Sequence, residues 1–177
     1  MRLGYATLTW YARTGSAADP RRTGGVQMVD PRASVTRECY ATALRKASRR
    51  LTSLYDEVLA PAGLRSTQYA ILAELADGEP VTINELARTL VLDRSGLGHS
   101  LRPLQRDGLV RLDKDAADRR SVNVTLTEEG RRQFERALEL WRSAQDRVVA
   151  VLGSPGADRL RDELTELATD DRLTAEP

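Results

Sequence analysis

Strand-like alternation occurs at one place in this 177-residue sequence, whereas every other patterned segment has the spacing of a helix. The two runs are 109–112 and 121–126, and in the second Val122, Val124 and Leu126 alternate with polar residues. The segment between them, 113–120, is charged and suits a hairpin loop. One short hairpin set among helices predicts an all-α fold with a small β-wing.

The remaining patterned segments repeat apolar residues at three- and four-residue steps. Two helix starts carry clear signals, because Thr82 is followed three residues later by Glu85, as in a capping box, and Thr127 suits an N-cap. Clusters of Gly and Pro separate the segments. The predicted order is four helices over about 39–60, 66–77, 83–90 and 94–108, then the hairpin, then two helices over about 127–152 and 157–170.

The fourth of these helices is the one that local propensity favours least. Gly96 and Gly98 each cost about 1 kcal/mol inside a helix, and Pro103 costs about 3 kcal/mol. Its apolar positions are nevertheless in helical register, which predicts that they face inward: Leu97, Leu101 and Leu104.

Charge is distributed unevenly along the chain, although the formal net charge is only +1. Residues 94–120 hold seven Lys or Arg against four Asp, whereas residues 155–177 hold three Arg against seven acidic residues. Binding to a polyanion must therefore come from a local patch, and the segment 94–120 is the place for it.

Several function classes are disfavoured by composition. The single cysteine, Cys39, allows no disulfide within the chain, and no apolar run approaches the length of a membrane span, so a cytoplasmic protein without membrane contact is expected. His99 is the only histidine, which argues against a multi-histidine metal site. Ser95 lies one turn from His99, but Asp93 should cap the helix and point away from the imidazole. No catalytic, metal-binding or cofactor-binding residues are therefore predicted.

The segment 82–108 has the length and order of a helix-turn-helix, a short capped helix followed by a helix with a polar outer face. Arginine can read guanine in a major groove, and an arginine at a hairpin tip suits a narrow minor groove. The alternative is an ordinary solvated helix followed by a charged turn that keeps the hairpin soluble. The predicted DNA-binding residues are Arg94, Ser95, Gly98, His99 and Arg102 on the helix, and Lys114, Asp118, Arg119 and Arg120 in the hairpin.

Four stretches, in order and spacing, resemble the MarR (multiple antibiotic resistance regulator) family. They are 63–72 (GLRSTQYAIL), 82–87 (TINELA), 101–110 (LRPLQRDGLV), and 118–120 (DRR) running into 124–130 (VTLTEEG). The resemblance covers about residues 39–167 and implies a winged helix-turn-helix transcriptional regulator, with Arg120 as the minor-groove arginine and Asp118 as its acidic companion. It also implies a homodimer on double-stranded DNA with a pseudo-palindromic operator, in most members a repressor that responds to a small aromatic or phenolic effector.

The boundaries that follow are a flexible N-terminal tail over 1–34 and a MarR-type domain over 35–177. Within that domain the winged lobe covers about 65–126, and dimerisation helices cover about 36–60 and 127–170, because their apolar stripes exceed what one lobe can bury. Tyr55, Tyr69 and Trp141 are candidates for an effector pocket, with core packing as the alternative. Two other functions stay open: a redox regulator that uses Cys39, and a helical interaction module that has lost DNA binding.

Overall fold

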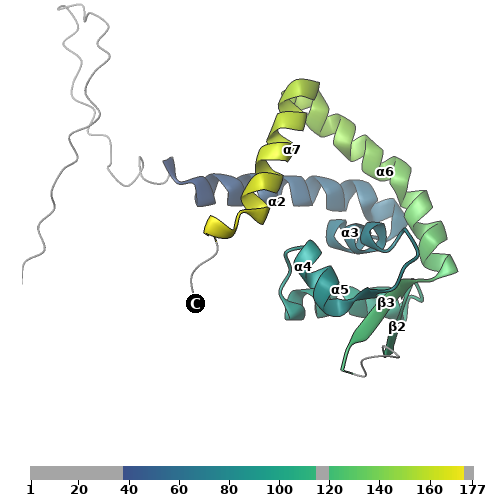
Figure 1. Ribbon diagram of the computed structural model, residues 1–177. Helices are drawn as coiled ribbons and strands as arrows, with labels where there is room; N and C mark the ends of the chain where they lie inside the picture. Colours follow the sequence, from purple (N-terminus) through teal and green to yellow (C-terminus); the bar gives the residue numbers. More distant parts are fainter. Residues whose placement is uncertain (1–37, 115–119, 174–177) are drawn as a thin grey trace, which may run out of the picture. The chain divides into compact units, whose positions relative to one another are not determined.

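The computed structural model describes residues 38–114 and 120–173. The chain divides into the units Met1–Tyr40 and Ala41–Pro177, and the elements below belong to the second unit, apart from the first residue of α2. Figure 1 shows their arrangement. In chain order they are α2 (Tyr40–Leu59), η1 (Ala60–Ala62), α3 (Ser66–Glu74), β1 (Val81–Thr82), α4 (Ile83–Thr89), α5 (Arg94–Arg106), β2 (Val110–Lys114), β3 (Val122–Leu126), α6 (Glu128–Leu152), α7 (Ser154–Thr169) and η2 (Asp171–Leu173).

The prediction of a mostly helical fold with a small β-wing is confirmed, with one correction to the sheet. The sequence predicted two strands, but the sheet has three antiparallel strands in the order β1-β3-β2. Val81 of β1 pairs with Val124 of β3, and Thr82 pairs with Asn123. A two-residue strand has no alternation of its own to detect, and it exists because β3 supplies its hydrogen-bonding partners.

The boundaries of the tail and the MarR-type domain remain predictions, because residues 1–37 lie outside the described part of the chain. The helix predicted over about 39–60 is α2 and starts at Tyr40, so Cys39 precedes it; the start at about 36 given for the dimerisation segment lies outside the described residues. The second ends earlier than expected, at Glu74.

Burial of leucines explains why α5 forms despite its glycines and its proline. Leu97, Leu101 and Leu104 are 0%, 3% and 1% exposed and belong to the single core cluster that α3, α4 and the sheet also line. Full burial of one leucine contributes about 1.5–3 kcal/mol, so three of them contribute about 4.5–9 kcal/mol, which matches or exceeds the local cost of about 5 kcal/mol from Gly96, Gly98 and Pro103. The packing of the lobe overrides local propensity here.

The start of α3 is held by a carboxylate from α2. Asp56 Oδ1 accepts hydrogen bonds from the backbone amide and the hydroxyl of Ser66, both at 2.8 Å, and Arg65 lies 3.1 Å from Oδ2. Partial burial opposes the charged form of Asp56, but the bonds from Ser66 and Arg65 outweigh it and lower the pKa of this carboxyl below its ordinary value. Asp56 therefore holds the C-terminal part of α2 against the first turn of α3, the first helix of the winged lobe.

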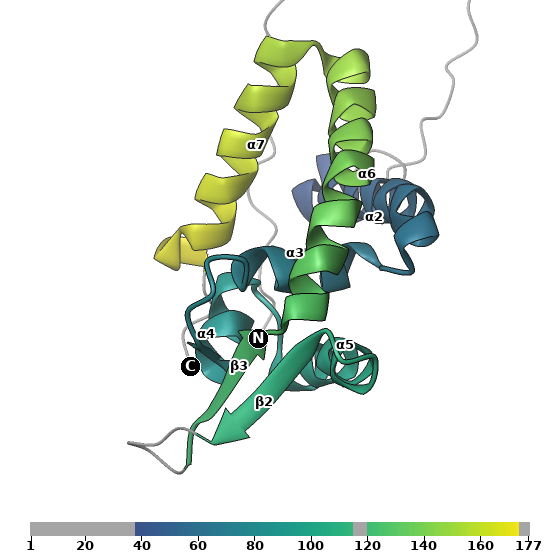
Figure 2. The same ribbon diagram turned by 90° about the vertical axis from the view of Figure 1, so that its right-hand side faces the viewer.

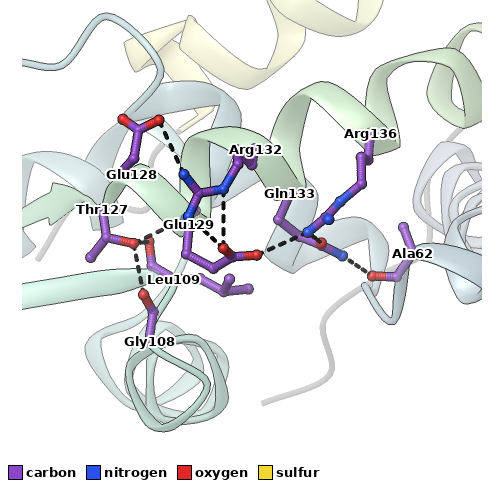
Figure 3. A network of polar contacts seen from close by, with 10 residues as sticks. Ala62, Gly108, Leu109, Thr127, Glu128, Glu129, Arg132, Gln133 and Arg136 are labelled. Carbon is purple, nitrogen blue, oxygen red and sulfur yellow. Dashed lines mark hydrogen bonds and ion pairs between the residues drawn. The ribbon is translucent and has the colours of Figure 1, made fainter.

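The base of the wing meets α6 at one threonine (Figure 3). The Thr127 hydroxyl donates to the carbonyl of Gly108 at 2.7 Å and accepts the amide of Gly130 at 3.0 Å, so it caps α6 and also binds the turn between α5 and β2. The Thr127 amide donates to the Leu109 carbonyl at 3.1 Å. Gly130 is buried and packs so closely on the residue before β2 that a Cβ there would lie 2.0 Å from the Leu109 carbonyl oxygen.

The two C-terminal helices leave apolar side chains uncovered. Only Gly153 separates α6 from α7, and the chain reverses its direction at this turn (Figure 2), from which the two helices diverge (Figure 1). No residue of α7 is buried, and Val151, Leu152 and Leu167 are 82%, 44% and 54% exposed. None of the helices in the described part of the chain is long and apolar enough to cross a membrane.

Candidate nucleic-acid interface

The polar residues predicted on the fourth helix share the exposed side of α5. Arg94, Ser95, His99 and Arg102 are exposed and Gly98 is half-buried, while the three leucines of α5 face the core. Arg94, Gly98 and Arg102 follow one another at intervals of four residues along one side of the helix. The structure therefore places these five predicted residues together on one accessible helical surface.

Both ends of α5 are fixed by local hydrogen bonds. At its start, Asp93 Oδ1 accepts the amide of Gly96 at 2.8 Å, so Asp93 serves as the N-cap that the sequence predicted. At its end, Gly108 has a φ of 71° and its amide donates to the Gln105 carbonyl at 3.1 Å. These bonds cap both ends of α5 and hold its first and last turns.

Five of the seven cations of the segment 94–120 fall into two groups. Arg106 lies 2.9 Å from Asp107, and Arg111 lies 2.5 Å from Asp113, so the charge of each is partly neutralised by a neighbour. The Asp107 carboxylate raises the pKa of the Arg106 guanidinium, chiefly by accepting its hydrogen bond. A second group has no carboxylate contact within the described residues: Arg94, Arg102 and Lys114. Among the described residues, the cations without a carboxylate contact thus lie on α5 and at the end of β2.

The tip of the wing is described only at its two margins. Lys114 ends β2 and Arg120 precedes β3, and both are exposed. Asp118 and Arg119, which the sequence also predicted as DNA-binding residues, lie outside the described residues.

Two exposed residues beside α5 were not predicted. Arg88 lies in the last turn of α4, where its charge helps to lower the pKa of the Glu85 carboxyl after the hydrogen bonds from Thr82. Val91 in the turn is 70% exposed and has a φ of 49°, the one non-glycine residue with positive φ in the described chain. The position of Arg88 in a capped helix was readable from the sequence, whereas the backbone angle of Val91 was not.

The residues predicted for an effector pocket pack as part of the core. Tyr69 is 6% exposed and its ring stacks on Phe134 at 5.4 Å and on Trp141 at 6.0 Å between centroids. Burial raises the pKa of the Tyr69 phenol and of the half-buried Tyr55 phenol. A separate open cavity of about 590 Å³ lies along α2, and none of these three aromatic residues lines it: Ser48, Arg49, Thr52, Ser53, Asp56, Glu57 and Arg65.

Cys39 is half-buried and directly precedes α2. Among residues 38–114 and 120–173, no three His, Cys, Asp or Glu side chains are grouped so that they could hold a metal ion. The carboxylate of Asp93 is bound at the N-terminus of α5, as expected, rather than turned toward His99.

The class of fold defined by these features is a winged helix-turn-helix, in which α4 and α5 form the helix pair and β2 and β3 the wing. The family model described as the MarR family matches residues 62–121. The regulator FarR of Neisseria gonorrhoeae is 30% identical over 125 residues, which cover 71% of this chain and 86% of FarR. The chain therefore belongs to the MarR family of transcriptional regulators.

Other curated relatives are matched over a smaller share of their length. The organic hydroperoxide resistance regulator of Bacillus subtilis is 30% identical over 97 residues, 55% of this chain and 66% of the relative. The repressor NicR of Pseudomonas putida is 34% identical over 87 residues, 49% of this chain and 55% of NicR. The chain thus spans about half to two thirds of the length of these two proteins.

Two similar solved structures contain DNA. The Mycobacterium tuberculosis regulator MosR in complex with DNA is 36% identical, with a TM-score of 0.66, over 74% of this chain and 94% of MosR. The repressor CouR of Rhodococcus jostii, bound to a 23-mer duplex, is 29% identical, with a TM-score of 0.68, over 75% of this chain and 94% of CouR.

Proposed function

We propose that the chain is a sequence-specific, double-stranded DNA-binding transcriptional regulator that acts as a homodimer. The observation that carries the proposal is the exposed side of α5, where Arg94 and Arg102 have no carboxylate contact within the described residues. A helix with two unneutralised arginines, held between fixed caps beside a β-wing, suits the major groove of a duplex. MosR and CouR, whose solved complexes contain DNA, support this assignment.

A dimer is supported by the uncovered apolar side chains of the long helices. Leu44 of α2 is 48% exposed, and Val151 and Leu167 are more exposed still. Pairing with a second copy would remove these surfaces from water and would present α5 twice, as a pseudo-palindromic operator requires.

The mode of regulation that fits this proposal is repression relieved by a small aromatic or phenolic effector, with Tyr55, Tyr69 and Trp141 as candidates for its pocket. CouR and NicR, which are named repressors, support repression. An effector would act by binding one spacing of the two α5 helices better than the other. Because Tyr69 is buried, the effector would have to open the packing between α3 and α6 to reach it.

Thiol regulation through Cys39 is a second candidate, supported by the likeness to the B. subtilis hydroperoxide regulator. Titrating DNA binding with an organic hydroperoxide, for the wild type and for Cys39→Ser, separates the two modes. If both proteins respond equally, Cys39 is not the sensor.

The proposal is tested by selecting bound sequences from a random duplex pool and then measuring affinity for the selected site. We expect a pseudo-palindrome. Arg102→Ala should weaken binding at particular base pairs by about 1–3 kcal/mol, whereas Arg120→Ala should weaken it largely through groove shape. Arg159→Ala, on α7 and paired with Glu163, is the matched control and should leave affinity unchanged. Recovery of no sequence above background, or full affinity in both Arg102→Ala and Arg120→Ala, would refute the proposed interface.

A further inference from the structure

Gly98 occupies a position in α5 at which the fold itself does not need glycine. Its φ is not among the positive values that other glycines of the described chain adopt, and a Cβ built there would meet no atom within 4 Å. At Gly96, in contrast, a Cβ would come within 3.6 Å of the Asp93 carboxylate that caps the helix. Glycine is less favourable than alanine inside a helix, so Gly98 weakens α5 without a compensating contact within the chain.

The surroundings of Gly98 indicate where the compensating contact lies. Arg94 stands one turn before it and Arg102 one turn after it, both exposed, while Leu97 and Leu101 face the core. Gly98, which has no side chain, therefore lies on the side of α5 that would face DNA in the proposed function. An external surface that approaches α5 closely at this point would account for the glycine.

The chemistry of a bare helix backbone restricts what that surface can be. Gly98 has no side-chain donor or acceptor, and its backbone amide is used within the helix, so it presents mainly Cα–H groups. Most groups on the edges of bases in the major groove are hydrogen-bond donors or acceptors, and the apolar one is the 5-methyl group of thymine. A methyl group projecting from the base needs the room that a side chain at position 98 would occupy.

Building on the proposed function, we propose that Gly98 of each protomer packs against the 5-methyl group of one thymine in each operator half-site. Arg94 and Arg102 bind on either side of this contact and hold α5 close to the base pairs. Gly98 is thus a specificity-determining position, at which the helix backbone rather than a side chain distinguishes thymine from the other bases.

A pair of matched methyl changes tests this contact. Gly98→Ala adds a methyl group to the protein, and replacing thymine by deoxyuridine removes one from the DNA. On the selected operator, Gly98→Ala should weaken binding by about 5- to 100-fold, the usual consequence of overpacking a close contact. With deoxyuridine at one symmetry-related pair of thymines, the variant should recover most of this loss, whereas the wild type should bind the same duplex more weakly than the natural one.

Gly96→Ala is the matched control, because it makes the same chemical change two residues away in the same helix. It should show no coupling to deoxyuridine at any position. Thermal unfolding should give Gly98→Ala a Tm about 2–4 °C above the wild type, so that weaker binding cannot be attributed to unfolding.

Three results would overturn the inference. The first is full affinity of Gly98→Ala for the natural operator, and the second is a loss that no deoxyuridine substitution restores. In both, Arg102→Ala would still weaken binding, so the proposed function would stand. In the third, the wild type binds no duplex selectively, and the proposed function falls together with the inference.

Discussion

At the scale of single residues, the turn between α4 and α5 contains a conformation that its side chain disfavours. Val91 donates from its amide to the Arg88 carbonyl at 3.2 Å, and Leu92 donates to the Ala87 carbonyl at 2.9 Å, which together make a Schellman motif. The residue in the left-handed conformation of this motif is usually glycine, as it is at Gly108 after α5. A β-branched side chain in this conformation is strained.

Replacing Val91 by glycine should therefore stabilise the protein. Release of about 1–3 kcal/mol of strain exceeds the entropy cost of glycine, about 0.5–1 kcal/mol, and Val91 is too exposed to lose much packing. We expect a Tm higher by about 2–4 °C, measured by calorimetry.

Gly108→Ala makes the opposite change at the corresponding position of the next helix. No atom lies within 4 Å of its Cβ position, so only the backbone angle of 71° matters. It should destabilise by about 1 kcal/mol. Equal Tm values for Val91→Gly and the wild type would show that Val91 is not strained.

Gly130 is constrained by space rather than by its backbone angle. A Cβ there would lie 2.0 Å from the backbone oxygen of Leu109 and 2.7 Å from a side-chain carbon of Leu126. Since backbone must move to admit it, Gly130→Ala should lower the free energy of unfolding by at least about 3 kcal/mol in urea denaturation. Gly156→Ala in α7, where the nearest atom is 3.6 Å away, should be neutral or stabilising. A loss below about 1 kcal/mol for Gly130→Ala would contradict the close contact.

At the scale of elements, the sequence best predicts features that depend only on residues close together in the chain, such as helix caps and the exposed face of a helix. The Thr82–Glu85 capping box is present, with the Thr82 hydroxyl accepting the Glu85 amide at 3.1 Å. Its signal lies within four residues, so it is readable without the fold. The exposed face of α5 was predictable for the same reason, because the period of Leu97, Leu101 and Leu104 determines which side is left for solvent.

Contacts between distant segments were not predictable from the sequence. Strand β1 depends on pairing with β3, and the capping of α3 by Asp56 joins residues ten positions apart. Arg131 of α6 donates to the Ala76 carbonyl at 3.0 Å, across 55 residues. The residues next to each of them in the sequence form no pattern from which the distant partner could be identified.

The junction of α2 and α3 gives a prediction about pH. Because the pKa of Asp56 is lower in the folded chain than its ordinary value of 3.8, its ionised carboxylate stabilises the fold above about pH 4. That stabilisation is lost as the pH falls through the lower folded pKa. Asp56→Ala should thus reduce the free energy of unfolding by about 1–2 kcal/mol at pH 7, and the difference from the wild type should shrink below about pH 4.

Urea unfolding over a series of pH values measures this difference. Glu57→Ala is the control, because the adjacent carboxylate is 74% exposed and lies 4.0 Å from Arg147, and such a surface pair contributes little. A pH-independent difference for Asp56→Ala would show that the charge of Asp56 does not stabilise the junction.

At the scale of the whole molecule, the exposed apolar side chains of α2, α6 and α7 predict a concentration-dependent dimer. Leu167→Glu would place a charge in the interface, and it should weaken dimerisation at least about tenfold in sedimentation equilibrium. Val91→Asn, at an exposed apolar residue of the winged lobe, should leave association unchanged. A wild type that is monomeric at all concentrations would remove the basis for two symmetric half-sites.

The Thr127 hydroxyl joins the carbonyls of Gly108 and Leu109, which connect α5 to the wing, to the first turn of α6. Because α6 has 25 residues, it extends about 37 Å from this junction, so a small tilt at Thr127 moves its far end by a large distance. Tilting a helix of that length by about 5° displaces its far end by about 3 Å, close to the rise of one base pair. In the proposed dimer, a tilt of a few degrees at Thr127 would therefore change the separation of the two α5 helices by about one base pair, enough to favour or prevent binding to both half-sites.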